Sequence, residues 1–477
     1  MRYINGNDRN QSTMFPEVLD DYIDDNNSVR FIDAFIDGLD LAAMGFTYSE
    51  PKETGRKPYN PGDLLKLYIY GYLNKIRSSR QLEKATHGNL ELIWLMRRLQ
   101  PDFKTIADFR KDNSKAIKAV FREFTLLCKK MDLFGCELIA IDGSKFKAYN
   151  SNDRNFTKNK LAKLIKKIDD QIDEYLHDLD HGDEKEEDVK EFSAKELKEK
   201  IEQLRQKKEK YKNLQSQLEQ SKEGQISLTD PDSRMMPSRQ VNDVCYNVQI
   251  VTDSKHKLIV SNEVTNEIND LHQLHSIAVE AKAVLEVEEI DAVADAGYFE
   301  RENIKKCHDD QINTYVPRPC RSHNKSIGLY TNKDFIYDSE KDIYQCPAGR
   351  ILTFRGIRKL KESGITERIY TTHDCYSCPI KTKCTRSKAT RRIYRWEHEE
   401  IIEKLDQRVK ENPNIVNRRK ELVEHPFGTL KNWMGHHHFL TKGSMNVSTE
   451  MNLISLAYNI KRVLNIVHFK ELMAWIS

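Results

Sequence analysis

Two spacings of hydrophobic residues divide this chain of 477 residues. Up to about Asp132, apolar side chains recur every three or four positions, as at Leu64, Leu67 and Tyr68, and this spacing predicts a series of short amphipathic helices. Asp63 is a candidate N-cap for one of them. These helices could form a small bundle, or they could present basic side chains to DNA as helix-turn-helix units do.

Further along, short continuous apolar runs replace the helical spacing. Runs at residues 138–141, 245–251, 258–261, 292–294 and 312–316 predict buried strands, with helices over 270–285 and from Arg301. The resulting order is strand, hairpin, helix, strand, helix, strand. We therefore predict an α/β (α+β) fold with a mixed sheet of the ribonuclease H type, behind a helical N-terminal domain.

The segment 155–222 interrupts this order with almost only Lys, Glu, Asp, Gln and Leu. Leu161, Ile165 and Ile168 begin one heptad-like run, and Leu197, Ile201 and Leu204 begin a second. The two runs predict an antiparallel, coiled-coil-like helical hairpin inserted in the core. Its role could be dimerisation, DNA contact or spacing.

The net charge of +3 hides an uneven distribution. Residues 1–50 carry ten acidic against three basic residues, whereas residues 350–395 carry thirteen basic against three acidic ones. Such a basic segment favours a phosphate backbone, because binding releases counterions, although a solvated loop is the simpler explanation. No apolar run is long enough to cross a membrane and no signal peptide is apparent, so we expect a cytoplasmic protein without membrane contact.

Three acidic residues in distinctive surroundings are the main candidates for chemistry. Asp142 and Asp295 follow apolar runs and precede glycines, where a buried strand ends, and Glu424 lies in a helix-like stretch ahead of Lys431. Three carboxylates from two strands and a helix could hold two Mg²⁺ ions against a phosphodiester. The sequence thus predicts a divided metal site for in-line phosphoryl transfer.

A second candidate metal site consists of cysteines. Cys375 and Cys378 form a C-x2-C pair, with Cys346 before it and Cys384 after it. Four thiolates are the ligand set of a structural Zn²⁺ site, and unliganded thiols are the alternative. The cluster coincides with the basic segment, so residues 330–398 are predicted to form a basic, Cys-rich insertion that grips DNA, with Arg391, Arg392 and Arg395 among its DNA contacts.

Several short stretches in this order resemble bacterial insertion-sequence transposases of the DDE type, in the branch with a Y-R-E-K helix signature. They are Pro101-Asp102-Phe103-Lys104-Thr105-Ile106-Ala107-Asp108-Phe109-Arg110, Ile141-Asp142-Gly143-Ser144, Thr229-Asp230-Pro231-Asp232-Ser233-Arg234-Met235-Met236, Tyr246-Asn247-Val248-Gln249, Ala294-Asp295-Ala296-Gly297-Tyr298, Glu424-His425-Pro426-Phe427-Gly428-Thr429-Leu430-Lys431 and Tyr458-Asn459-Ile460-Lys461-Arg462.

The resemblance implies a DNA transposase that cleaves insertion-element ends and joins them to target DNA with Mg²⁺ or Mn²⁺. Asp142, Asp295 and Glu424 are then the catalytic metal ligands, and Lys431 contacts DNA. Asn417 stands where the signature has tyrosine and Lys420 where it has arginine, while Arg418 and Arg419 are shifted in register. We expect Arg418, Arg419 and Lys420 to supply positive charge near the scissile phosphate.

The predicted domains are 1–132 (helical, DNA-binding), 133–329 (catalytic core with the hairpin insertion), 330–398 (Cys-rich insertion) and 399–477 (helices bearing Glu424). The expected partners are double-stranded DNA and, on DNA, a second copy of the chain, with no small-molecule substrate. Two other functions stay open. One is an inactive, transposase-derived DNA-binding protein, and the other is a metal-dependent nuclease that does not join strands.

Overall fold

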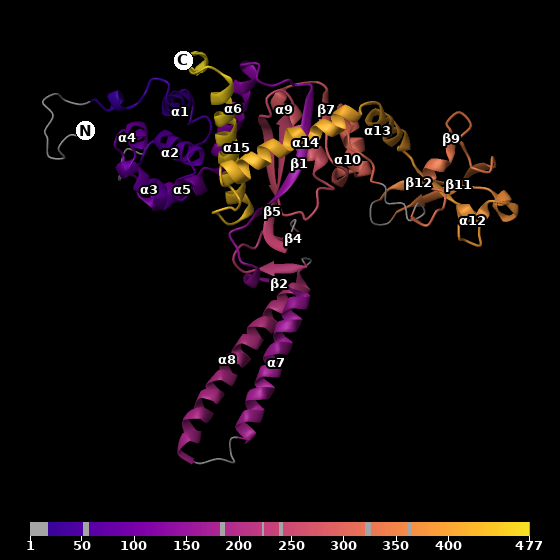
Figure 1. Cartoon of the computed structure of the whole chain (residues 1–477), viewed down its shortest axis with the longest axis horizontal. Coiled ribbons are helices and arrows are strands. Elements are labelled where there is room, and N and C mark those ends of the chain that lie inside the picture. Colours follow the sequence, from indigo (N-terminus) through magenta and orange to yellow (C-terminus); the bar gives the residue numbers. More distant parts are fainter. Residues whose placement is uncertain are drawn as a thin grey trace, which may run out of the picture. The chain divides into compact units, whose positions relative to one another are not determined.

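The computed structural model (Figure 1) describes residues 18–50, 57–181, 187–221, 224–237, 242–319, 326–360 and 364–476. The chain forms two compact units. The first contains the residues up to Gly135, Gly143–Asn269 and the residues from Val423, and the second contains Cys136–Asp142 and Asp270–Leu422. The domain boundaries predicted from the sequence stay a prediction.

The N-terminal part of the first unit is helical, as predicted. Its helices are α1 (Ser28–Asp37), α2 (Pro61–Leu73), α3 (Ser79–Gly88), α4 (Leu90–Leu95), α5 (Phe103–Asp112) and α6 (Ser114–Lys130), after a short 3-10 turn at Leu19–Tyr22. The predicted N-cap of α2 is wrong. Asn60 caps the helix through the Gly62 N–H, and Asp63 lies in the first turn, where it pairs with Arg97.

Strand β1 (Leu138–Lys147) belongs to both units, since its residues up to Asp142 lie in the second and the rest in the first. In the second unit it pairs in parallel with β7 (Ile290–Val293), which pairs in parallel with β8 (Ile312–Tyr315). In the first unit, β5 (Asn242–Asp253) pairs antiparallel with β4 (Arg234–Pro237) and β6 (Ile259–Thr265). The order β4-β5-β1-β7-β8, with β6 also paired to β5, confirms the predicted mixed sheet of the ribonuclease H type.

Helices pack against both parts of the sheet. In the first unit α15 (Ser444–Ile466) contacts β6, α2 and α6, and α16 (Phe469–Ile476) contacts α1. The middle of α15 is buried on all sides, which explains its run of apolar residues from Leu453 to Ile460. In the second unit α9 (Leu274–Leu285) contacts α10 (Arg301–Asp309), and α10 and α13 (Glu399–Glu411) contact β8.

The two heptad-like runs form α7 (Lys158–His181) and α8 (Glu187–Gln220), which lie side by side (Figure 1). Leu161 and Leu218 pack together near the sheet, beside the small pair β2 (Asn155–Thr157) and β3 (Gln225–Ser227). Farther out, Ile168, Ile172 and Ile201 form the next cluster. These clusters confirm the predicted hairpin insertion.

The Cys-rich segment contains a second, antiparallel sheet that the sequence analysis did not predict. Its strands are β9 (Ile336–Asp338), β10 (Ile343–Gln345), β11 (Ile351–Lys359), β12 (Thr366–Thr371) and β13 (Ile393–Trp396), in the order β13-β12-β11-β10-β9. Its core is small and largely aromatic, with Phe335, Tyr344, Leu352, Tyr370 and Ile393 buried. Among the described residues, no helix is long and apolar enough to span a membrane.

Candidate functional site

The parallel pairing of β1 and β7 relates the positions of Asp142 and Asp295. Ala140 lies opposite Val293, and each acid comes two residues later in its own strand direction. Because side chains alternate along a strand, Asp142 projects from the same face as Ala140. Asp295 lies two residues beyond the end of β7, and the charges of both acids act on Tyr298, so the two side chains lie in the same neighbourhood. The prediction that the strand before Asp142 ends there is wrong, because β1 continues to Lys147.

Asp142 forms an ion pair with Arg419, which lies on α14 (Pro413–Gly428). The Nη1 atom of Arg419 is 3.3 Å from Oδ1 of Asp142, and both side chains are mostly buried, with 15% and 22% exposed. The Arg419 guanidinium offsets the negative charge of Asp142, which lies in the neighbourhood of a second acid, Asp295. The site therefore contains positive charge from the expected basic stretch, although the residue that provides it is Arg419 and not the aligned Lys420.

The loop after β7 orients Asp295. Its Oδ1 accepts the Gly297 N–H at 2.7 Å and caps the 3-10 turn Ala296–Tyr298. A Cβ atom at Gly297 would lie 2.9 Å from this oxygen, so the turn requires glycine here. One oxygen of Asp295 is thereby held by the backbone, which limits how the carboxylate can rotate.

Tyr298 lies near these two acids and is fully buried. Burial, followed by the nearby charges of Asp270, Asp142 and Asp295, raises the pKa of its phenol well above the usual value, so the side chain stays neutral. Asp270 is an addition to the site that sequence reasoning missed. Nothing in its local sequence marks it, because only the packing of the loop before α9 brings it near Tyr298.

Glu424 and Lys431 lie where the backbone of α14 departs from a regular helix. Glu424 is exposed on α14, and Pro426 two residues later cannot donate an N–H to the helix. A π-helical turn, Thr429–Trp433, follows and carries Lys431. Such turns are rare and are often associated with functional sites.

The Lys431 ammonium is directed onto the second half of β1. It donates to Ser144 Oγ at 2.6 Å and to the Lys145 carbonyl at 2.8 Å, and lies 4.5 Å from the centre of the Phe146 ring. Lys431 therefore stabilises the strand segment that directly follows Asp142. Its predicted contact with DNA stays a prediction.

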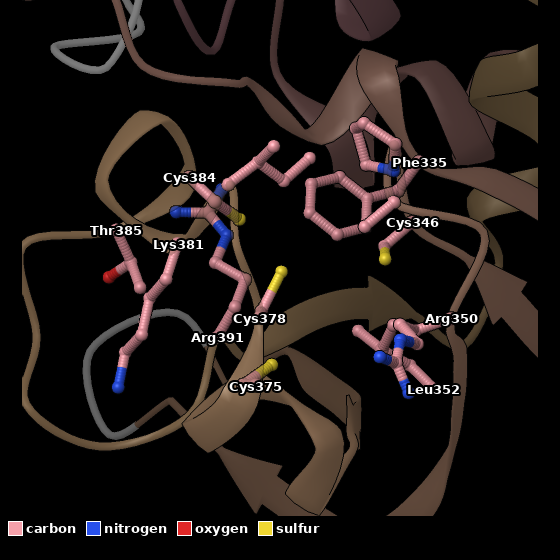
Figure 2. Close-up of a pocket in the computed structure, with 13 residues that line it drawn as sticks. Phe335, Cys346, Arg350, Leu352, Cys375, Cys378, Lys381, Cys384, Thr385 and Arg391 are labelled. Atoms are coloured by element: carbon pink, nitrogen blue, oxygen red, sulfur yellow. The ribbon is translucent and has the colours of Figure 1, made fainter.

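The four cysteines of the second candidate site line a single pocket in the second unit, although they are far apart in the sequence. Figure 2 shows Cys346, Cys375, Cys378 and Cys384 around this pocket. Cys346 and Cys384 also pack against the small aromatic core of the second sheet. Burial raises the pKa of the Cys384 thiol, and the other three sulfurs act in the same direction.

Within the described part of the chain, no group of three or more His, Cys, Asp or Glu side chains is arranged to hold a metal ion. The structure thus brings together the pair Asp142 and Asp295, and it gathers four cysteines around a pocket without closing them into a tetrahedral arrangement. Both donor sets match the ions predicted for them, since Mg²⁺ prefers carboxylate oxygens and Zn²⁺ prefers thiolates.

The predicted DNA-contacting side chains differ in accessibility. Arg392, Arg418 and Lys420 are exposed. Arg391 is half-buried, hydrogen-bonded to Asn332 at 3.1 Å and close to the face of the Phe335 ring.

Arg395 is only 7% exposed. It pairs with Glu403 and lies over the Tyr337 ring at 3.8 Å. Because its guanidinium already has a carboxylate partner and a ring contact, we leave Arg395 out of the DNA-contacting set and assign it to the packing of the second sheet.

Comparisons with known proteins identify two segments of the chain. Residues 17–112 match the family model of a transposase domain, and residues 345–464 match that of a transposase DDE domain. No curated protein matches the sequence. A solved structure, the cryo-EM structure of the piggyBac transposase synaptic complex with hairpin DNA, is similar at 8% identity over 94% of this chain and 78% of that chain.

The TM-score of that similarity is 0.32, which is too low to support an argument. The two family models are independent of it. They cover the N-terminal helices and a region that extends from the Cys-rich segment through α14 into α15, and they agree with the motifs of the sequence. Two separate segments of the chain thus match transposase family models, in agreement with the resemblance to DDE-type transposases seen in the sequence.

Proposed function

We propose that this chain is a DNA transposase that cuts DNA at the ends of an insertion element and joins the freed ends to target DNA, using Asp142, Asp295 and Glu424 as metal ligands. The observation that carries the proposal is the parallel register of β1 and β7, in which Ala140 lies opposite Val293, each two residues before one of the two acids Asp142 and Asp295. Like charges this close repel, and a bound divalent cation offsets that repulsion.

The donor set suits Mg²⁺ or Mn²⁺, because carboxylate oxygens are hard ligands. Two such ions, when bound, activate the attacking oxygen and stabilise the leaving oxygen of an in-line displacement. Cleavage and joining are the same displacement with different nucleophiles, first water and then a 3′-hydroxyl. One site can therefore serve both steps.

The surrounding residues have supporting roles in this proposal. The Gly297 N–H fixes one oxygen of Asp295, leaving the other for a ligand. Arg419 forms an ion pair with Asp142. If a cation bound beside this carboxylate, the Arg419 guanidinium could pair with a DNA phosphate instead. Lys431 holds the strand beyond Asp142 through Ser144 and Lys145, which keeps Asp142 in position.

Glu424 is proposed as the third ligand because it lies on α14, in the stretch that resembles the Y-R-E-K helix signature and within the segment that matches a transposase DDE domain. Glu421 is the alternative ligand on the same helix, three residues before Glu424. Only one of these carboxylates is expected to be essential.

We also propose a structural Zn²⁺ site formed by Cys346, Cys375, Cys378 and Cys384, and DNA contacts through Arg391, Arg392, Arg418 and Lys420. The second sheet has only a small aromatic core, so a bound metal would add to the stability of its fold. Two copies of the chain are expected on DNA, because two element ends must be brought together. A location at the nucleoid follows from this function.

The test is a cleavage and joining assay on DNA that carries the ends flanking the gene, with Mg²⁺ or Mn²⁺. Wild type is compared with Asp142→Asn, Asp295→Asn and Glu424→Gln, and Glu421→Gln is the matched control. We expect nicking and joining by wild type and by Glu421→Gln, and a loss of at least about 100-fold in the other three, since each removes a charged ligand.

Other outcomes separate the remaining functions. Loss of activity in Glu421→Gln but not in Glu424→Gln would move the third ligand to Glu421. Cleavage without joining would favour a nuclease, and DNA binding by wild type without any metal-dependent cleavage would favour an inactive DNA-binding protein.

A further inference from the structure

Charge is segregated along the helical hairpin formed by α7 and α8. The inner part, residues 158–168 with 205–220, carries ten basic and two acidic residues. In the outer part whose side chains are described, residues 169–177 and 195–204, there are seven acidic and three basic residues. The hairpin thus has a strongly basic stretch next to the sheet and an acidic stretch beyond it.

The packing between the helices shows that the two inner stretches lie alongside each other. Leu161 and Leu164 of α7 pack with Tyr211, Leu214 and Leu218 of α8. An ion pair between Asp169 and Lys208 marks the boundary between the basic and the acidic part. Positive charge from two distant segments of the sequence is therefore combined on one short section of the hairpin, within a single unit of the structure.

Three lysines form the centre of the basic section. Lys163, Lys166 and Lys167 are exposed, whereas Leu161 and Ile168 on the same helix are buried against α8. Lys166 and Lys167 follow Lys163 by three and four positions, so all three side chains project from the face of α7 that points away from α8. Among the described residues, none of the three has an ion-pair or hydrogen-bond partner.

Like charges spaced in this way repel and destabilise a helix. The outer part of the hairpin avoids this by mixing signs, as with Lys195 and Glu199 or Lys198 and Glu202. In the inner part the three lysines repel one another. A bound polyanion would stabilise them, because each phosphate offsets one lysine charge.

Building on the proposed function, we propose that the inner half of the hairpin is a DNA-binding surface that contacts the phosphate backbone of double-stranded DNA through Lys163, Lys166 and Lys167. The eleven residues of the α7 part span about 16 Å, enough for a few consecutive phosphates and too little for a long track. The acidic outer half repels DNA and so limits the contact to the inner half. The contact is independent of base sequence, since lysine side chains here meet phosphates and not base edges.

The test uses the full chain and a DNA duplex of about 40 base pairs with arbitrary sequence, titrated at several salt concentrations. The variant is Lys163→Gln, Lys166→Gln and Lys167→Gln together. Its matched control is Lys195→Gln, Lys198→Gln and Lys200→Gln, which removes the same charge from exposed positions of the outer half. All six side chains are exposed, and circular dichroism verifies that both variants keep the wild-type helix content.

In a plot of the logarithm of the DNA-binding constant against the logarithm of salt concentration, each lost phosphate contact reduces the steepness of the negative slope by about 0.9. We expect the inner variant to lose about 1 to 3 from this slope, which corresponds to about 5-fold to 150-fold weaker binding near 0.15 M salt. The outer variant should bind as wild type or slightly better. Equal affinity and slope in the inner variant and wild type would overturn the proposal.

A change of sedimentation mass in the inner variant, with unchanged DNA binding, would also overturn it and would favour a role in self-association. The proposed catalytic function is judged separately, by the cleavage activity of the Asp142 and Asp295 variants. A wild-type chain that cleaves DNA while the inner variant binds normally would remove the hairpin surface and leave the catalytic proposal intact.

Discussion

The carboxylate of Glu450 is expected to stabilise the fold more than any surface charge, because it is completely buried. Its oxygens accept the Leu440 N–H at 3.2 and 3.0 Å, the Thr441 N–H at 3.1 Å and the Thr441 hydroxyl at 2.8 Å. Its counter-charge is Arg77, 3.4 Å away and itself 7% exposed. This network connects the helical N-terminal part to the segment after Lys431.

The substitution Glu450→Gln keeps the shape and removes the charge. It leaves the Arg77 guanidinium buried without a carboxylate, although the carbonyls of Gly435 and His438 still accept its hydrogen bonds. Breaking a buried ion pair on one side costs about 3–5 kcal/mol. We expect a loss of about 3 kcal/mol in the free energy of unfolding, which lowers the melting temperature by about 4–5 °C for a unit of this size.

The assay is thermal and urea unfolding of wild type, Glu450→Gln, Arg77→Met and the double variant. In the double variant both charges are gone, so we expect it to be more stable than the sum of the two single losses by about 1–3 kcal/mol. A loss below about 1 kcal/mol in Glu450→Gln, or strictly additive losses, would refute the argument that the two charges depend on each other.

Three further predictions concern single side chains. Burial lowers the pKa of His436 to about 3, so folding favours its neutral form, and stability is lost as the pH falls below the unfolded pKa of about 6.5. Between pH 7.5 and 5.0, the free energy of unfolding of wild type, measured with urea, should fall by about 2 kcal/mol more than that of His436→Phe. Parallel pH profiles of the two proteins would contradict this. Lys431→Met removes two hydrogen bonds to β1 and should cost about 1–3 kcal/mol, measured by calorimetry, whereas an unchanged melting temperature would show that these bonds contribute nothing. Wild type should bind about one zinc ion per chain, measured by elemental analysis, and Cys378→Ser should bind less. Cys136→Ser, which changes a cysteine outside the pocket, should bind as much zinc as wild type. Wild type without zinc would show that the proposed zinc site does not exist.

Much of this protein follows from local sequence patterns. The apolar runs that end at Asp142 and before Asp295 predict strands, because a buried strand needs continuous apolar side chains. The heptad spacing from Leu161 predicts α7 for a similar reason, since one helix face must bury itself against a partner. The second sheet was not predicted, because strands such as β11 bury few residues, in this case Leu352, and their sequences do not alternate between apolar and polar residues.

Other features depend on tertiary structure. Strand alternation and register, which are properties of paired strands, bring Asp142 and Asp295 into the same neighbourhood. Asp270 approaches Tyr298, and Arg395 is buried over the Tyr337 ring, because of packing between segments that are separated in the sequence. Local sequence determined most strands and helices of the main sheet and the candidate acids, since these depend on neighbouring residues. Only the tertiary structure decided which charges meet and which are buried, because electrostatic interactions and burial depend on distance in space.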